Sequence, residues 1–126
     1  MIAAMQRLFA LRGANSVERN DAESILEATD ELMRELIARN ALTPEAMVSC
    51  IFTLTNDLDA EFPAVAARAL GLNQVPLLCS REVPVPGSLP RVVRVLMHYY
   101  AEPDHVSQHV YLGEARVLRA DLQSAQ

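Results

Sequence analysis

An arginine in the middle of an apolar strand is the feature that most restricts how this chain can fold. Residues 91–100, RVVRVLMHYY, are mostly β-branched, aromatic or apolar, which is typical of a strand. Because side chains alternate across a sheet, Arg94 shares one face with Val92 and Leu96. A guanidinium among apolar neighbours is costly to bury without an anion. The fold must therefore bring Arg94 a partner, and both Glu82 and a bound anionic ligand fit the residues.

The first third of the chain contains one strand and one long helix. Residues 7–12 are expected to form the strand, and a loop follows. Asn20 is the expected N-cap of the helix, with Glu23 three residues later completing a capping box. The helix is expected to end near Asn40. One of its sides carries a stripe of mostly apolar residues, which predicts packing on a core: Ile25, Leu26, Thr29, Leu32, Met33, Leu36 and Ile37.

The other strands are expected later in the chain, separated by turn residues and one shorter helix. The pattern predicts a helical turn over 42–47 with Thr43 as cap and Pro44 in first position, a strand over 48–55, a helix from Pro63 to Gly71, strands over 74–80 and 91–100, a turn or short helix over 104–112, and a final strand and tail over 114–122.

This order of elements predicts an α+β fold, with one mixed β-sheet and helices on one face. The length of 126 residues favours a single domain over residues 1–126. Along the predicted strands, the side chains that point to either face of the sheet are apolar, so the face without helices must also be buried against protein. We therefore expect a homo-oligomer whose sites lie at the junctions between subunits.

Charge and composition exclude several classes of protein. The formal net charge is −5, which argues against nucleic-acid binding. No apolar run is long enough to span a bilayer, and no signal peptide is recognisable, so we expect a cytoplasmic protein without a membrane partner. Cys50 and Cys79 are expected to be free thiols. The three histidines lack the spacing of a metal site, so no metal is expected: His98, His105 and His109.

The candidate site residues are a set of charged and polar side chains near strand ends. No nucleophile elbow, phosphate loop or dinucleotide fingerprint occurs. Arginines with Glu82, Tyr111 and Cys79 could bind a polyanionic small molecule and stabilise charge. Plainer interpretations also stand: Phe62 fits a hydrophobic staple before Pro63, and Cys79 fits a core position.

Four separated segments resemble the monofunctional AroH-type chorismate mutases: RGANSVERN, DLDAEFPAVAAR, VPLLCSREVPVPGSLPRVVRVL and HVYLGEARVLRADL. They occur in the order of that family and cover the chain from about Leu11 to Gln126. The resemblance implies a homotrimer with a pseudo-α/β-barrel core and active sites between subunits. It implies an isomerase that rearranges chorismate to prephenate on the route to phenylalanine and tyrosine, without a cofactor or covalent intermediate.

The resemblance also implies roles for individual residues. Arg94 matches the cation that faces the ether oxygen of the breaking bond. Glu82 matches a carboxylate that meets the substrate hydroxyl, with Cys79 beside it. Arg12 matches an arginine that holds the substrate, and Tyr111 a tyrosine that bonds a carboxylate. Residues matching the lining or mouth of the cleft are Phe62, Arg68, Leu118 and Arg119. The implied catalytic residues are Arg94, Glu82 and Arg12.

Some positions depart from the family pattern, and two other functions remain open. Val65 stands where a lysine can occur, Leu78 where a small hydroxyl residue can occur, and Ala120 where a proline follows the arginine. These departures concern substrate affinity more than chemistry. A RidA-like enamine or imine deaminase also uses an arginine in a subunit cleft. A metabolite-binding trimer without catalytic activity is the third alternative.

Overall fold

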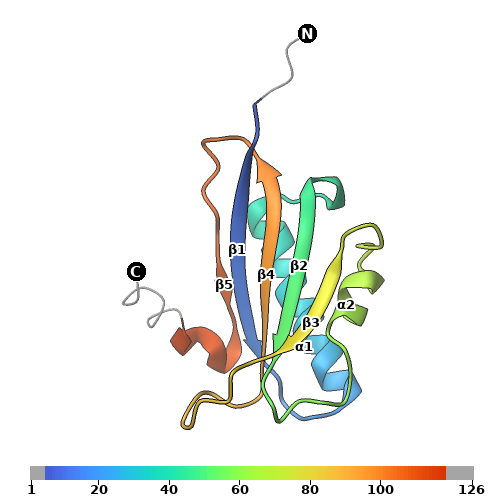
Figure 1. The fold of residues 1–126 in the computed structure, drawn as a ribbon, viewed down its shortest axis with the longest axis vertical. Helices are drawn as coiled ribbons and strands as arrows, with labels where there is room; N and C mark the ends of the chain where they lie inside the picture. The colour runs from blue at the N-terminus through green and yellow to red at the C-terminus, as the bar shows by residue number, and fades with distance from the viewer. Residues whose placement is uncertain (1–4, 119–126) are drawn as a thin grey trace.

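A five-stranded mixed sheet with two helices behind it forms the protein, whose computed structural model describes residues 5–118 (Figure 1). The elements in chain order are β1 (Arg7–Ser16), α1 (Ala22–Asn40), the 3₁₀ turn η1 (Pro44–Ala46), β2 (Met47–Leu54), α2 (Ala64–Ala69), β3 (Leu77–Arg81), β4 (Val92–Ala101), β5 (Val110–Tyr111) and the 3₁₀ turn η2 (Gly113–Arg116).

The strand order is β3-β2-β4-β1-β5, which places β4 in the centre. β4 runs antiparallel to both neighbours, whereas β3 is parallel to β2 and β5 is parallel to β1. Arg94 on β4 lies opposite Ala14 of β1 and Thr53 of β2. The predicted α+β class with a mixed sheet is therefore confirmed.

The core fills the space between the sheet and its helices. β4 contributes Val93, Val95, Met97 and Tyr99, all at most 3% exposed. The expected apolar stripe of α1 packs there, with Leu32 and Leu36 fully buried. Gly13 allows the close approach of α1 to β1, since a Cβ at this position would lie 2.9 Å from a methyl group of each leucine.

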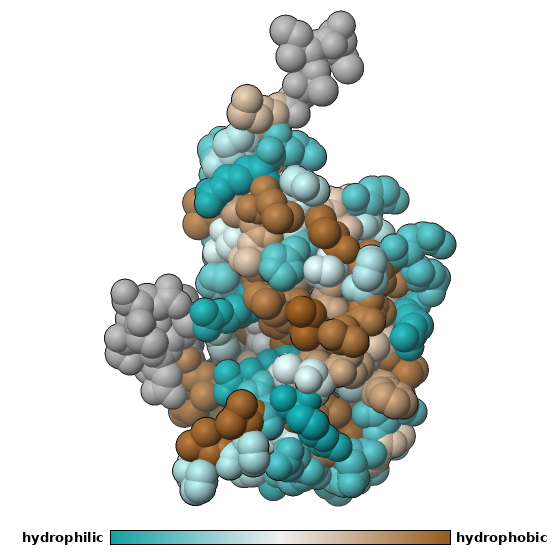
Figure 2. Space-filling view, viewed as in Figure 1, coloured by the Kyte–Doolittle hydropathy of each residue, from teal (hydrophilic) through white to brown (hydrophobic). Residues whose placement is uncertain are grey.

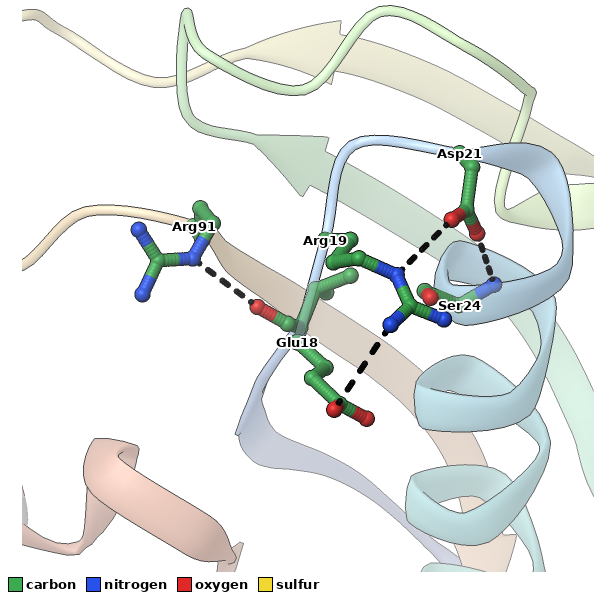
Figure 3. Close-up of polar contacts among 6 residues, drawn as sticks. Glu18, Arg19, Asp21, Ser24 and Arg91 are labelled. Carbon is green, nitrogen blue, oxygen red and sulfur yellow. Dashed lines mark hydrogen bonds and ion pairs between the residues drawn. The ribbon is translucent and has the colours of Figure 1, made fainter.

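The N-cap of α1 is Asp21, and the prediction of Asn20 was wrong. The Asp21 carboxylate accepts the backbone N–H of Ser24 at 2.7 Å (Figure 3). The Asn20 side chain instead bonds to the turn after β2, donating to the Asp59 carboxylate and accepting its backbone N–H. Both residue types are good caps, so the tertiary contact with Asp59 decides which of them caps the helix.

Replacing Asp21 by alanine should lower the thermal midpoint by a few degrees near neutral pH. The hydrogen bond from Ser24 lowers the pKa of Asp21 below its usual 3.8. A carboxyl group with a lowered pKa stabilises the fold above its unfolded-state pKa, and this contribution disappears as the pH falls through the folded-state value. Thermal melts of both proteins should therefore differ at pH 7 and converge on acidification. A difference that kept its full pH 7 size at pH values below the folded-state pKa of Asp21 would contradict the cap assignment.

Several predicted boundaries in the sheet were also wrong. β1 does not end at residue 12 but runs to Ser16, because it stays paired with β4 as far as Val92. β3 begins at Leu77, after Pro76, and not at residue 74. The stretch 104–112 contains the edge strand β5, and the turn η2 replaces the described part of the strand expected over 114–122. Residues 119–122 of that stretch lie outside the described residues.

The face of the sheet opposite the helices, called here the open face, carries exposed apolar side chains. Leu8 and Tyr100, which lie opposite each other on β1 and β4, are 47% and 45% exposed, and Leu78 on β3 is 62% exposed. Figure 2 shows apolar side chains gathered over the strands on this side. Within residues 5–118, neither helix combines the length and apolarity needed to cross a bilayer.

Candidate active site

A cavity of about 410 Å³ lies over the sheet and is lined by residues of β2, β4, β1 and β5. Arg12, Glu82, Arg94 and Tyr111 line it together, with apolar walls from Ile51 and Leu96. These polar residues come from separate parts of the chain and were all expected at the site. We call this the first cavity. Its volume is in the range of small-molecule sites, and its two arginines against one glutamate suit an anionic ligand.

Arg94 forms an ion pair with Glu82 at the rim of this cavity. Arg94 Nε lies 3.4 Å from Glu82 Oε2, and their side chains are 44% and 23% exposed. Arg94 therefore does not sit in the core. The alternation of β4 sends Val93 and Val95 to the helices and Arg94 to the open face. The pair engages Nε, so the Nη groups of the guanidinium can serve as donors to a ligand.

Arg12 on β1 and Tyr111 on β5 are held by contacts between these two strands and by a contact of the segment before β5 with α1. The backbone N–H of Arg12 donates to His109 Nδ1 at 3.0 Å, and Ala14 pairs with Tyr111. At the C-terminal end of α1, Asn40 accepts the backbone N–H of Gln108 at 2.7 Å and donates to its carbonyl at 3.0 Å. The His109 side chain thus extends the short β1–β5 pairing, and the Asn40 side chain ties the segment before β5 to α1. Together these contacts place Tyr111 next to Arg12.

A second cavity, of about 360 Å³, contains two more of the expected residues, Phe62 and Cys79. Phe62 is 68% exposed, so it does not act as a buried staple. Cys79 is half-buried, whereas Cys50 is buried and burial raises the pKa of its thiol to about 12. The residues lining this cavity are all different from those lining the first. Within one subunit the expected site residues therefore fall into two groups.

Two more expected residues, Arg68 and Leu118, line neither cavity. Arg68 is exposed on α2. Leu118 is half-buried and packs near Ala14 and Ala115. Arg119 lies outside the described residues, as does Ala120. Of the two departures that are described, Val65 is 36% exposed on α2, and Leu78 lies on the open face. Across residues 5–118, no three His, Cys, Asp or Glu side chains form a group suited to a metal ion.

Thr53 is a site residue that sequence reasoning missed. It lines the first cavity, and its hydroxyl donates to Glu82 Oε2, the same oxygen that meets Arg94. A β-branched residue in a buried-looking strand gives no signal of this role. Only the register, which sets Thr53 opposite Arg94, brings the three side chains together.

Comparisons with known proteins show which family the chain belongs to. Residues 8–122 match the family described as chorismate mutase type I. The chain is 50% identical over 118 residues to the chorismate mutase AroH of Thermus thermophilus, covering 92% of this chain and 97% of that protein. It is 41% identical over 114 residues to the chorismate mutase AroH of Bacillus subtilis strain 168, covering 89% and 90%.

A solved structure of a chorismate mutase also matches this chain in its fold. The chorismate mutase from Clostridium thermocellum superposes with a TM-score of 0.82 and 43% identity, covering 86% of this chain and 98% of that one. The match in sequence over nearly the whole chain, together with the match in fold, decides against the deaminase alternative. This chain belongs to the type I, AroH-type chorismate mutase family.

Proposed function

We propose that this chain rearranges chorismate to prephenate as a homotrimer, in clefts that combine the first cavity of one subunit with the second cavity of its neighbour. The observation that carries the proposal is the Arg94–Glu82 pair, which lines one cavity together with Arg12 and Tyr111. A dicarboxylate needs cations, and a reacting ether oxygen needs a fixed donor. The first cavity supplies both kinds of group.

The reaction is an intramolecular rearrangement in which a carbon–oxygen bond breaks while a carbon–carbon bond forms. Negative charge grows on the ether oxygen in the transition state. Arg94, held by Glu82, presents its Nη groups to that oxygen and stabilises it more in the transition state than in the ground state. No proton is moved and no bond to the protein forms, so we assign no base, nucleophile, metal or cofactor.

The remaining residues of the first cavity hold the substrate in its reactive conformer. Arg12 and Tyr111 meet its carboxylates. Glu82 meets its hydroxyl through Oε1, since Thr53 and Arg94 both engage Oε2. One well-placed donor accounts for about 3–4 kcal/mol, whereas enzymes lower barriers by about 8 kcal/mol or more. Preorganised geometry must therefore contribute a further several kcal/mol.

Two observations support a cleft shared between subunits. Phe62 and Cys79 line the second cavity rather than the first, although both are expected to meet the same substrate. The open face exposes apolar side chains that a neighbouring subunit would cover. Arg68, Leu118 and Arg119 are assigned to the mouth of this cleft. The cytoplasmic location stays a prediction.

Purified protein should convert chorismate to prephenate without added metal or cofactor. The assay follows the loss of chorismate absorbance in the ultraviolet and identifies the product by proton NMR. A folded protein that left chorismate unchanged would favour the metabolite-binding alternative and contradict the proposed function.

A further inference from the structure

The loop between Glu82 and Arg94 is held at both of its ends by one turn. This loop, residues 83–90, contains three of the seven prolines and carries the chain from β3 back to β4. The turn starts at Leu54, the last residue of β2, and comprises residues 54–58; we call it the anchoring turn. Figure 1 shows the loop beyond the end of the sheet where β2 gives way to this turn. The position of the turn therefore affects where Glu82 and Arg94 lie relative to each other.

On the Glu82 side, the anchoring turn makes three contacts through its carbonyl groups. The backbone N–H of Glu82 donates to the Leu54 carbonyl at 3.0 Å. The neighbouring Arg81 donates through Nη1 to the carbonyls of Thr55 and Leu58, at 3.0 and 2.6 Å. These bonds fix the end of β3, from which the Glu82 carboxylate projects towards the first cavity.

On the Arg94 side, the contacts run mainly through side chains of the same turn. Asp57 accepts the backbone N–H of Arg91, at 3.0 Å from Oδ2 and 3.2 Å from Oδ1. Thr55 Oγ1 accepts the backbone N–H of Val92 at 3.0 Å and donates to Asp57 Oδ1 at 2.5 Å. The carboxylate of Asp57 thus bonds directly to Arg91, the residue before β4, and through the Thr55 hydroxyl to Val92, the first residue of β4.

Arg91 needs this support because its backbone is in the left-handed region, with φ of 50°. A residue with a side chain adopts this conformation only at a cost, so neighbouring contacts must hold it there. Arg91 Nε donates to the Val17 carbonyl at 3.2 Å, and the Arg91 carbonyl accepts the Val17 N–H at 2.8 Å. Figure 3 shows Arg91 Nε facing the loop that leads into α1. Asp57 provides the remaining contact, at the backbone N–H.

We propose that Asp57 is a positioning residue for catalysis: by accepting the N–H of left-handed Arg91, it sets where β4 begins and hence where Arg94 meets Glu82. The inference rests on the proposed function for its consequence in catalysis. Asp57 itself is exposed and does not line the first cavity. Its influence passes from Arg91, which precedes β4, through Val92 and Val93 to Arg94.

The test compares Asp57→Ala, Asp57→Asn and a matched control, Asp21→Ala. The control also removes a carboxylate that accepts a backbone N–H, but at the start of α1. We expect Asp57→Ala to lower kcat about 10-fold or more, with KM changed by less than about threefold, because Arg94 acts mainly in the transition state. Asp57→Asn keeps an oxygen acceptor for Arg91 and should retain most of the wild-type kcat. Asp21→Ala should lower the thermal midpoint and leave kcat unchanged.

A second readout follows Arg94 directly. The Nε–H resonance of Arg94 in proton–nitrogen NMR spectra, assigned by its loss in Arg94→Lys, should shift in Asp57→Ala and not in Asp21→Ala. An unshifted resonance, an unchanged kcat in Asp57→Ala, or a loss of kcat shared by Asp21→Ala would overturn the inference. If Arg94→Ala kept full turnover, the proposed function would fail. The shift of the resonance would still report the positioning by Asp57.

Discussion

Replacing Arg94 by alanine should lower kcat for chorismate by about 10²–10³-fold, the usual cost of removing one donor to a developing negative charge. The substitution takes away the cation beside Glu82 and leaves the substrate-holding residues Arg12 and Tyr111 in place. KM should therefore change much less than kcat. Because Arg94 is partly exposed on the open face, no core cavity forms, and the circular dichroism spectrum should stay that of the wild type.

Arg39→Ala is the matched control for this prediction. Arg39 is also a partly exposed arginine paired with a glutamate, at 3.2 Å from Glu35, but it lies on α1. It should keep wild-type turnover. Replacing Arg94 by citrulline, the neutral isostere of arginine, would remove the charge and keep the shape of the side chain. We expect the kcat of this variant to lie within about tenfold of that of Arg94→Ala. Near-normal turnover of a folded Arg94→Ala protein would refute the catalytic assignment.

Mixing two inactive variants should restore activity if each cleft is shared by two subunits. Arg94→Ala disables the first cavity. Phe62→Glu places a carboxylate in the second cavity, where it would repel a dianionic substrate, and like charges at such a contact cost several kcal/mol. We expect Phe62→Glu alone to lose about 10²-fold or more in kcat/KM. Phe62 is exposed, so the substitution should leave the fold intact.

Equal amounts of the two variants, dissociated and reassembled together, should recover about a quarter of wild-type activity. In a random mixture each cleft draws its two halves independently from two neighbours, so about one cleft in four has both halves intact. The measurement is kcat per subunit before and after reassembly, with the trimer confirmed by its mass in solution. If the reassembled trimer regained no activity, each active site would lie within one subunit. A monomeric mass at micromolar concentration would contradict the assembly itself.

Local pattern in the sequence was sufficient for most of the elements. The stripe on α1 and the run of residues 91–100 are periodic because one side of each must contact the core, so the helix and the central strand could be predicted. The N-cap could not, because Asn20 and Asp21 are equally good caps and only the contact of Asn20 with Asp59 distinguishes them. The short edge strand β5 carries too few residues for a period to show.

The sequence by itself determined the α+β class and the family and predicted an anionic partner for Arg94, since each depends on residue types and spacing along the chain. Only the tertiary structure decided that Glu82 and Thr53 meet at Arg94, that Phe62 and Cys79 line a different cavity, and that Asp57 holds the start of β4. These contacts depend on strand register and loop closure. Both are set by the packing of segments distant in sequence, which no local pattern encodes.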